Sequence, residues 1–566
     1  MNKKGWLKTY EIVLIWKTFR LSSLYIILIA GSVIGICLLA GVPPVSRDAL
    51  THHLFIPKLY LQHGGMYEIP HLLVSYYPMN LDLLYIIPLY FNNDILPKFI
   101  HFSFALIICV MIYRYLVRRI DATYALLGVL FFLTIPVIVR LSSTVYVDLG
   151  LICFLFASLL YLFDWIESGF KHRYLIFSAL YCGLAMGTKY NGLIGLFLLG
   201  LFVTFVYARY HAGQKQYAVK AVAYCIVFVI SALIIFSPWM VRNVIWTGNP
   251  VYPLYNSLFI AAETNDTNPE TELEDSVNMS HIRILRDIYG ESWFQIALIP
   301  LRVFFQGQDD DPQYFDGRTN PFLLLLPFFA FLGIGFGARQ EKTEKLLLLF
   351  FSVLFLLYAC VQASIRVRYF SAILPPLVLL SMFGLYNIQT KILNRSFFLS
   401  NSIRKMVVPG IIIFMIGLNA IYLVNRFKQD QPISYLFGDV PRDKYIQTYR
   451  PEYAAYQYAN KHLASDSKIL GIYLGNRGYY SDRYIEFSTE ILKKLASNSN
   501  NGYYIAEKLQ EKGFTHILIN LHLFNIWFKK YTEHEQQMLK YFFEFYTTPK
   551  FLKDEHCVMR IITKNG

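Results

Sequence analysis

The sequence SSLYIILIAGSVIGICLLAGVPPVSRDALTHH (residues 22–53) begins with a long apolar run and ends with a carboxylate and two histidines. The run from Ser22 to Ala40 is long enough to cross a membrane, because a helix needs about 20 apolar residues to do so. Asp48 follows closely, so we expect it at the membrane surface. A carboxylate costs roughly 2.5–3.5 kcal/mol at the centre of a membrane helix and less at the interface, which makes Asp48 a candidate functional residue.

The composition excludes a soluble enzyme. Of the 566 residues, 55% are hydrophobic and 16% are charged, and the mean hydropathy is +0.39. These values are typical of a polytopic membrane protein that is mainly α-helical. Apolar stretches predict about eleven transmembrane helices, at residues 22–41, 97–117, 122–140, 148–165, 173–188, 191–208, 218–239, 321–338, 345–362, 369–387 and 406–425.

The basic residues of the chain predict its orientation. With the N-terminus in the cytoplasm, every predicted inner loop is basic, as the positive-inside rule requires. These loops contain residues 118–119, 171–173, 209–220, 339–345 and 391–405. An odd number of crossings then places the C-terminal tail outside the cell (inner or plasma) membrane. We therefore attribute the formal charge of +14 mainly to the basic inner loops, which reflect the membrane topology. We expect no nucleic-acid partner.

Two domains are expected. Residues 1–425 form a transmembrane domain with two long outer loops, 42–96 and 240–320, that carry amphipathic surface helices. Residues 426–566 form a small extracytoplasmic α/β domain, because strand-like runs alternate with helical patterns there. The strand-like runs are Lys468–Tyr473, Thr515–Asn520 and Val558–Thr563, and the helical ones are Tyr453–Leu463 and Tyr503–Lys512.

Asp48 has two readings. It could simply cap the N-terminus of a helix that runs towards Gly64-Gly65, where the glycines would stop it. Alternatively, Asp48 and His52 lie on one face of that helix and look into a cavity, while the apolar stripe of Leu50 and Leu54 lies on lipid.

Further polar residues are predicted on the same outer side. Asp148 opens a span and could act with Asp48 or only cap its helix. Lys189 lies in a short outer turn, where it could bind a phosphate or only extend towards the lipid headgroups. Arg366 and Arg368, next to Tyr369, form a second outer cationic cluster whose guanidinium groups suit phosphate oxygens.

A divalent metal ion is left open as a cofactor, and no other cofactor is predicted. His52 and His53 beside Asp48 could bind a metal, as could Asp309-Asp310-Asp311, but neither spacing matches a known ligand loop. No phosphate-binding loop or dinucleotide fingerprint follows a strand, which argues against a nucleotide-dependent reaction. The seven cysteines form no disulfide or zinc pattern.

The motifs in residues 20–390 resemble those of the GT-C membrane glycosyltransferases, the superfamily of the protein O-mannosyltransferases and the lipid A aminoarabinose transferase. The matching features are Asp48 with its His-bearing helix, Asp148 at a later helix start, the turn Gly187-Thr188-Lys189-Tyr190, the loop start Gly248-Asn249-Pro250-Val251-Tyr252-Pro253, and Arg368-Tyr369 before Leu374-Pro375-Pro376. One departure is that Asp48 is flanked by Arg47 and Ala49, whereas the protein mannosyltransferases have an adjacent acidic residue there. The sugar and the acceptor therefore stay open.

The resemblance implies an inverting transfer of a sugar from a polyprenyl-phosphate donor to a glycan, lipid or protein acceptor. Asp48 would be the base, with Asp148 in support. The donor phosphate would be held by Lys189, Arg366, Arg368 and Tyr369, and the substrate pocket would include His52, His53 and Tyr190. A flippase or transporter of polyprenyl-linked glycans is the alternative. Transporters, however, place ionisable residues near the membrane midplane and often show repeats, whereas here these residues crowd the outer helix ends.

Overall fold

The computed structural model describes residues 3–259, 281–333, 338–361, 365–393 and 400–562. The chain divides into two compact units. The helical unit comprises Met1–Gly41, Tyr77–Leu81 and Lys98–Pro432, and the second unit comprises Val42–Tyr76, Asp82–Pro97 and Ile433–Gly566. Each unit is described by itself below.

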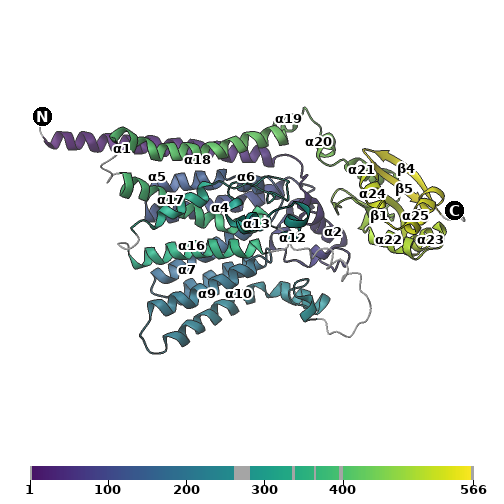
Figure 1. The fold of residues 1–566 in the computed structure, drawn as a ribbon, viewed down its shortest axis with the longest axis horizontal. Coiled ribbons are helices and arrows are strands. Elements are labelled where there is room, and N and C mark those ends of the chain that lie inside the picture. The colour runs from purple at the N-terminus through teal and green to yellow at the C-terminus, as the bar shows by residue number, and fades with distance from the viewer. Residues whose placement is uncertain (1–2, 260–280, 334–337, 362–364, 394–399, 563–566) are drawn as a thin grey trace. The chain divides into compact units, whose positions relative to one another are not determined.

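The helical unit is a bundle of long helices (Figure 1). Neighbouring helices pack in the series α1–α5–α17–α16–α9–α10, and α8 packs on both α7 and α10. The long elements are α1 (Lys3–Ala40), α4 (Leu96–Arg119), α5 (Ala122–Thr134), α6 (Pro136–Ser142), α7 (Asp148–Glu167), α8 (His172–Met186), α9 (Gly192–Tyr210), α10 (Tyr217–Thr247), α16 (Arg339–Cys360), α17 (Leu374–Asn387) and α18 (Asn401–Asp430). The short ones are η3 (Asn256–Leu258), α12 (His281–Arg283), η4 (Ile284–Ile288), α13 (Trp293–Ala297), α14 (Ile299–Arg302), α15 (Phe322–Leu325), η5 (Leu326–Phe331), η7 (Val367–Ile373) and η8 (Ile388–Leu393).

Within the described residues, eight helices are long and apolar enough to cross a membrane, or nine if a bent pair forms one span. The protein is thus an integral membrane protein, as predicted. All eleven predicted spans coincide with helical segments, but three are not simple rods. The segment 122–140 bends by 67° where α5 gives way to α6, because Pro136 starts a new helix. Among the described residues, the segment 173–188 contains 14 helical residues, Arg173–Met186 of α8, and the segment 321–338 contains ten, Phe322–Phe331.

The basic loops gather at one end of the helical unit. Glu344 at the start of α16 is fully buried and accepts hydrogen bonds from Tyr115 and Arg119 of α4, at 2.7 Å each. Arg119 also pairs with Glu167 at the end of α7, and Arg339 donates to the carbonyl of Arg209 at the end of α9. We call this the basic end. The motif residues Asp148, Lys189 and Arg368, which were predicted to lie outside, are at the other ends of their helices.

The second unit contains a five-stranded sheet in the order β2-β1-β3-β5-β4. Strand β1 (Lys468–Ile472) pairs in parallel with β2 (Tyr484–Phe487) and β3 (Phe514–Asn520), whereas β5 (His556–Ile561) is antiparallel to β3 and to β4 (Thr547–Lys553). Its helices are η1 (Ala49–His53), α2 (Phe55–His63), η2 (Leu73–Tyr76), α3 (Asn80–Tyr90, in this unit from Asp82), α19 (Pro432–Leu436), α20 (Arg442–Tyr449), α21 (Tyr453–His462), α22 (Glu490–Ser497), α23 (Gly502–Glu511), α24 (Leu521–Phe528) and α25 (Glu533–Phe545).

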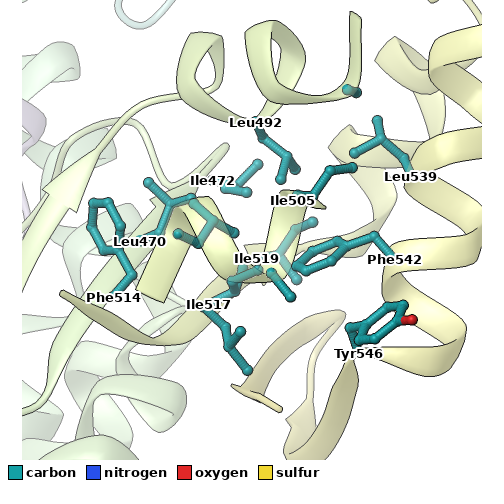
Figure 2. Close-up of a cluster of buried hydrophobic side chains, with 14 of the residues drawn as sticks. Leu470, Ile472, Leu492, Ile505, Phe514, Ile517, Ile519, Leu539, Phe542 and Tyr546 are labelled. Atoms are coloured by element: carbon teal, nitrogen blue, oxygen red, sulfur yellow. The ribbon is translucent and has the colours of Figure 1, made fainter. Parts of the chain in front are cut away.

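The core of this sheet confirms the predicted α/β character of the tail. Figure 2 shows Leu470 and Ile472 of β1 and Ile517 and Ile519 of β3 packed with Leu492, Ile505, Leu539 and Phe542 from helices. The three predicted strands correspond to β1, β3 and β5. Strands β2 and β4 were missed because they are edge strands: β4 carries Pro549 and lysines, which is how natural sheets protect an edge.

Most of the first outer loop belongs to the second unit by its contacts. The Lys58 ammonium of α2 donates to the carbonyls of Tyr479 and Ser481, at 2.9 and 2.8 Å. Leu50 and Leu54 are buried within this unit rather than lying on lipid. The predicted helix stop is confirmed: α2 ends at Gly64, which has a φ of 82°.

We expect the substitution Gly384→Ala in α17 to destabilise the helical unit. A Cβ at Gly384 would lie 2.1 Å from the carbonyl oxygen of Leu326, a backbone atom that cannot swing away. Overpacking of this kind costs about 1–3 kcal/mol. Thermal unfolding of the purified protein should therefore show a Tm several degrees below that of the wild type.

The matched control is Gly410→Ala in α18, where an added Cβ meets nothing within 4 Å. Its Tm should be unchanged or slightly higher, since alanine is the better helix former. Equal Tm values for the two variants would contradict the close packing of α17 on the Leu326 segment.

Candidate functional site

A buried ion pair forms the centre of the site in the helical unit. Asp148, the first residue of α7, has no solvent exposure, and its Oδ1 accepts a hydrogen bond of 2.7 Å from Lys189 Nζ. The second carboxylate oxygen of Asp148 is also buried and has no hydrogen-bond partner among the residues that the structure describes. A buried acceptor without a partner costs free energy, so Asp148 retains capacity to bind a donor from a substrate.

The turn that carries Lys189 is held by close backbone packing. The Asn80 N–H donates to the carbonyl of Gly187, at 2.9 Å, and the Asn80 side chain accepts from the indole of Trp239 in α10, at 2.8 Å. A Cβ at Gly187 would lie 2.3 Å from the Asn80 amide nitrogen, so only glycine fits. The lysine is therefore presented from a turn with a fixed backbone.

The ring of Tyr369 lies among three cations. Lys189 Nζ is 5.0 Å from its centroid, and the guanidinium carbons of Arg368 and Arg366 are 5.1 and 5.9 Å away. Arg368 also lies over the ring of Tyr146, at 4.8 Å. Cation–π contacts let aromatic faces hold positive groups without neutralising them. The structure thus brings together four residues that the sequence predicted for phosphate binding.

His101 of α4 was not predicted, yet it fixes the segment in which Asp148 lies. Its ring is fully buried, and Nδ1 donates to the carbonyls of Leu141 and Thr144, at 3.0 Å each. Its Nε2 accepts from the N–H of Leu149, at 3.0 Å, which assigns the neutral tautomer. The only sequence signal was a histidine within an apolar span.

Tyr190, predicted in the substrate pocket, is bonded within the protein. Its hydroxyl donates to the carbonyl of Tyr252, at 2.8 Å, and accepts from the Asn243 amide, at 3.0 Å. Burial raises the pKa of Tyr190, so the hydroxyl is neutral. Tyr190 therefore connects the Lys189 turn to the start of the second outer loop.

Two of the aspartates 309–311, Asp309 and Asp310, form ion pairs with an arginine, whereas Asp311 accepts from the Gln313 N–H. Arg140 of α6 pairs with Asp309, Asp310 and Asp316 at 3.4, 2.6 and 3.0 Å. Asp316 also lies 3.5 Å from Arg366, which links this cluster to the Tyr369 cations. Among the residues that the structure describes, no group of three or more His, Cys, Asp or Glu side chains could hold a metal ion.

The remaining predicted residues lie in the second unit. Asp48 occupies the N-cap position of η1, but its side chain makes no capping hydrogen bond and is partly exposed. His53 Nδ1 lies 2.7 Å from Asp82 Oδ1, and both side chains are buried. His52 hydrogen-bonds Thr51, at 2.8 Å, and its ring lies 4.0 Å from that of His53.

Comparisons with known proteins agree with this architecture. Residues 92–241 match the family model described as dolichyl-phosphate-mannose-protein mannosyltransferase. The crystal structure of ArnT from Cupriavidus metallidurans in the apo state is similar over 95% of this chain and 97% of that chain, with a TM-score of 0.55 and 11% sequence identity. The chain therefore shares the fold of ArnT, and the two matches together support a membrane glycosyltransferase of the GT-C superfamily.

The structure of the same ArnT bound to undecaprenyl phosphate is similar over 96% of this chain and 99% of that chain, at a TM-score of 0.55 and 10% identity. A comparison with curated protein sequences gives no significant match. The resemblance noted in the sequence is thereby confirmed at the level of the fold. The family match includes His101, Asp148 and Lys189, whereas Asp48 and the Arg366–Tyr369 segment lie outside it.

We expect a double-mutant cycle on Asp148→Asn and Lys189→Gln to reveal strong coupling. Each single variant leaves the other group without its charged partner in a largely buried setting, whereas the double variant leaves two neutral amides. The interaction free energy, measured from unfolding titrations of the purified protein, should be about 1–3 kcal/mol.

The control cycle is Glu341→Gln with Lys345→Gln, a pair on α16 in which Glu341 is 43% exposed. Its coupling should be only a few tenths of a kcal/mol, as is usual for such helix pairs. Additive effects at Asp148 and Lys189 would mean that their contact does not organise the site.

Proposed function

We propose that the protein transfers a sugar from a polyprenyl-phosphate donor to an acceptor hydroxyl on the outer face of the membrane, with inversion at the anomeric carbon. The observation that carries this proposal is the cluster of Lys189, Arg366 and Arg368 around Tyr369. Fixed cations of this kind stabilise a departing phosphate. The ArnT structure, which shares the fold, was determined with undecaprenyl phosphate, a lipid of this class.

In this proposal Lys189 and Arg368 hold the donor phosphate. Guanidinium groups bind phosphate oxygens in pairs, and an ammonium adds a compact positive charge. Asp148 keeps the Lys189 ammonium aimed through their 2.7 Å contact, and its second oxygen can accept a hydrogen bond from a sugar hydroxyl. A 1 Å displacement of such groups can cost a large part of the rate, so Asp148 supports catalysis through position.

Asp48 is the proposed general base. It takes the proton from the acceptor hydroxyl as that oxygen attacks the anomeric carbon. The bond from this carbon to the phosphate oxygen then breaks, and its electron pair leaves with the lipid phosphate. Since its side chain makes no capping hydrogen bond at η1, helix capping does not account for Asp48. His52 and His53, next to it, would line the acceptor side.

The proposed orientation follows from the two ends of the helical unit. The predicted inner loops supply Arg119, Arg209 and Arg339, which gather at the basic end. Positive loops stay in the cytoplasm, so this end would face inward and the Asp148–Lys189 end outward. The N-terminus would then be cytoplasmic, and the protein would lie in the inner or plasma membrane, with residues 433–566 outside.

We expect Asp48→Asn to lower the rate of sugar transfer by roughly 10²–10⁴-fold, the usual contribution of a positioned general base. The amide has nearly the same shape as the carboxylate, so the Tm should not change. Transfer would be measured in membranes as released glycans quantified by mass spectrometry. Asp466→Asn, an exposed carboxylate of the same unit, is the control and should retain full activity. A wild-type rate of sugar transfer by the Asp48→Asn variant would contradict the proposal that Asp48 is the general base.

We expect Lys189→Ala to weaken binding of polyprenyl phosphate by roughly 10- to 100-fold, because a hydrogen bond to a charged group contributes about 1.5–3 kcal/mol. Binding would be followed with a fluorescent polyprenyl phosphate and the purified protein. Acceptor binding should change less. Lys171→Ala, an exposed lysine before α8, should bind like the wild type. An unchanged affinity of the Lys189→Ala variant for polyprenyl phosphate would contradict the proposal that Lys189 binds the donor phosphate.

A further inference from the structure

A second cationic site lies at the basic end of the helical unit, away from Asp148 and Lys189. A cavity of about 710 Å³ opens between the end of α9 and the start of α16, and it is lined by Arg209, Ala212, Arg339 and Lys342. Three of these four residues are cations. Nothing in the proposed transfer uses them.

One cation of this cavity, Arg339 of α16, is held in place by the end of α9. Its guanidinium lies 4.2 Å from the ring centroid of Tyr210 and donates to the carbonyl of Arg209, at 2.6 Å. The Tyr210 hydroxyl in turn lies 3.2 Å from the hydroxyl of Thr343. An arginine fixed in this way loses little conformational entropy when it binds an anion.

The acidic groups nearby are already neutralised. Glu341 pairs with Lys345 at 2.6 Å, and the buried Glu344 accepts from Arg119 at 2.7 Å. Within the described part of the chain, neither Arg209 nor Arg339 forms an ion pair with a carboxylate. The start of α16 adds the partial positive charge of a helix N-terminus. The cavity is therefore suited to an anion.

Exposed apolar side chains continue from the cations along both helices. On α9, Phe205 lies one turn before Arg209 and is 68% exposed. On α16, Leu346 and Phe350 lie one and two turns after Lys342, with exposures of 39% and 49%. Residues four apart share one helix face, and α9 packs on α16. Exposed apolar side chains thus adjoin the cationic cavity on both helices.

We propose that this cavity binds the phosphate group of an anionic phospholipid, whose acyl chains lie against the exposed side chains of Phe205, Leu346 and Phe350. The same cations could take a free phosphate, but the adjoining apolar faces favour a phosphate that carries hydrocarbon chains. Basic pockets between membrane helices are known binding places for such headgroups. The site would anchor the basic end in its leaflet independently of sugar transfer.

The test compares lipid retention by the wild type and by the double variant Arg209→Gln/Lys342→Gln, which leaves Arg339 on Tyr210. The full-length protein is reconstituted in nanodiscs of phosphatidylcholine with one-fifth phosphatidylglycerol, and the retained lipid is counted by native mass spectrometry. Each cation near an anionic headgroup contributes roughly fivefold, so the variant should retain phosphatidylglycerol about 25-fold more weakly. Phosphatidylcholine retention should not change.

The control is Lys171→Gln/Arg173→Gln, which removes the same charge from an exposed turn at the same end. Equal phosphatidylglycerol retention by the two double variants would overturn the proposal. A parallel titration with inorganic phosphate tells whether the site binds a lipid headgroup or a free phosphate. Binding of inorganic phosphate that depends on Arg209 and Lys342, without retention of phosphatidylglycerol, would overturn the lipid assignment. A Tm equal to that of the wild type establishes that the variants are folded.

Discussion

The contact between Asp148 and Lys189 is the constraint on which the site depends. A carboxylate with no solvent exposure is tolerable only when a charged partner offsets its lost hydration, and Lys189 is that partner. The pair joins the start of α7 to the turn between α8 and α9. His101 from α4 and Asn80 then hold the backbone on either side. The helices α4, α7, α8 and α9 must therefore be packed correctly before the pair can form.

Tyr369 extends this constraint to the cations. An aromatic ring can contact several positive groups at once, because it attracts each of them without neutralising its charge. Lys189 is far from Arg366 and Arg368 in the sequence, yet all three contact one ring. A phosphate that entered here would meet groups already in position, so little reorganisation would be needed.

The sequence predicted those features that depend on composition and local pattern. Apolar length located the helices, and the loop charges identified the basic end. The motif residues Asp148, Lys189, Arg368 and Tyr369 converge because each marks the same end of its helix. Contacts between residues far apart in the sequence could not be predicted. The role of His101 depends on carbonyls about forty residues away, and the ion pairs of Arg140 with Asp309 and Asp310 join residues about 170 apart. Edge strands lack the apolar alternation that marks central strands.

Asp316 stands between two guanidinium groups, those of Arg140 and Arg366. If an arriving anion draws Arg366 away, the carboxylate keeps Arg140, and Arg140 still holds Asp309 and Asp310. The segment from residue 309 to residue 316 is therefore held by more than one ion pair. Binding of a ligand would move the Arg366 side chain, whereas the backbone of residues 309–316 would keep its position.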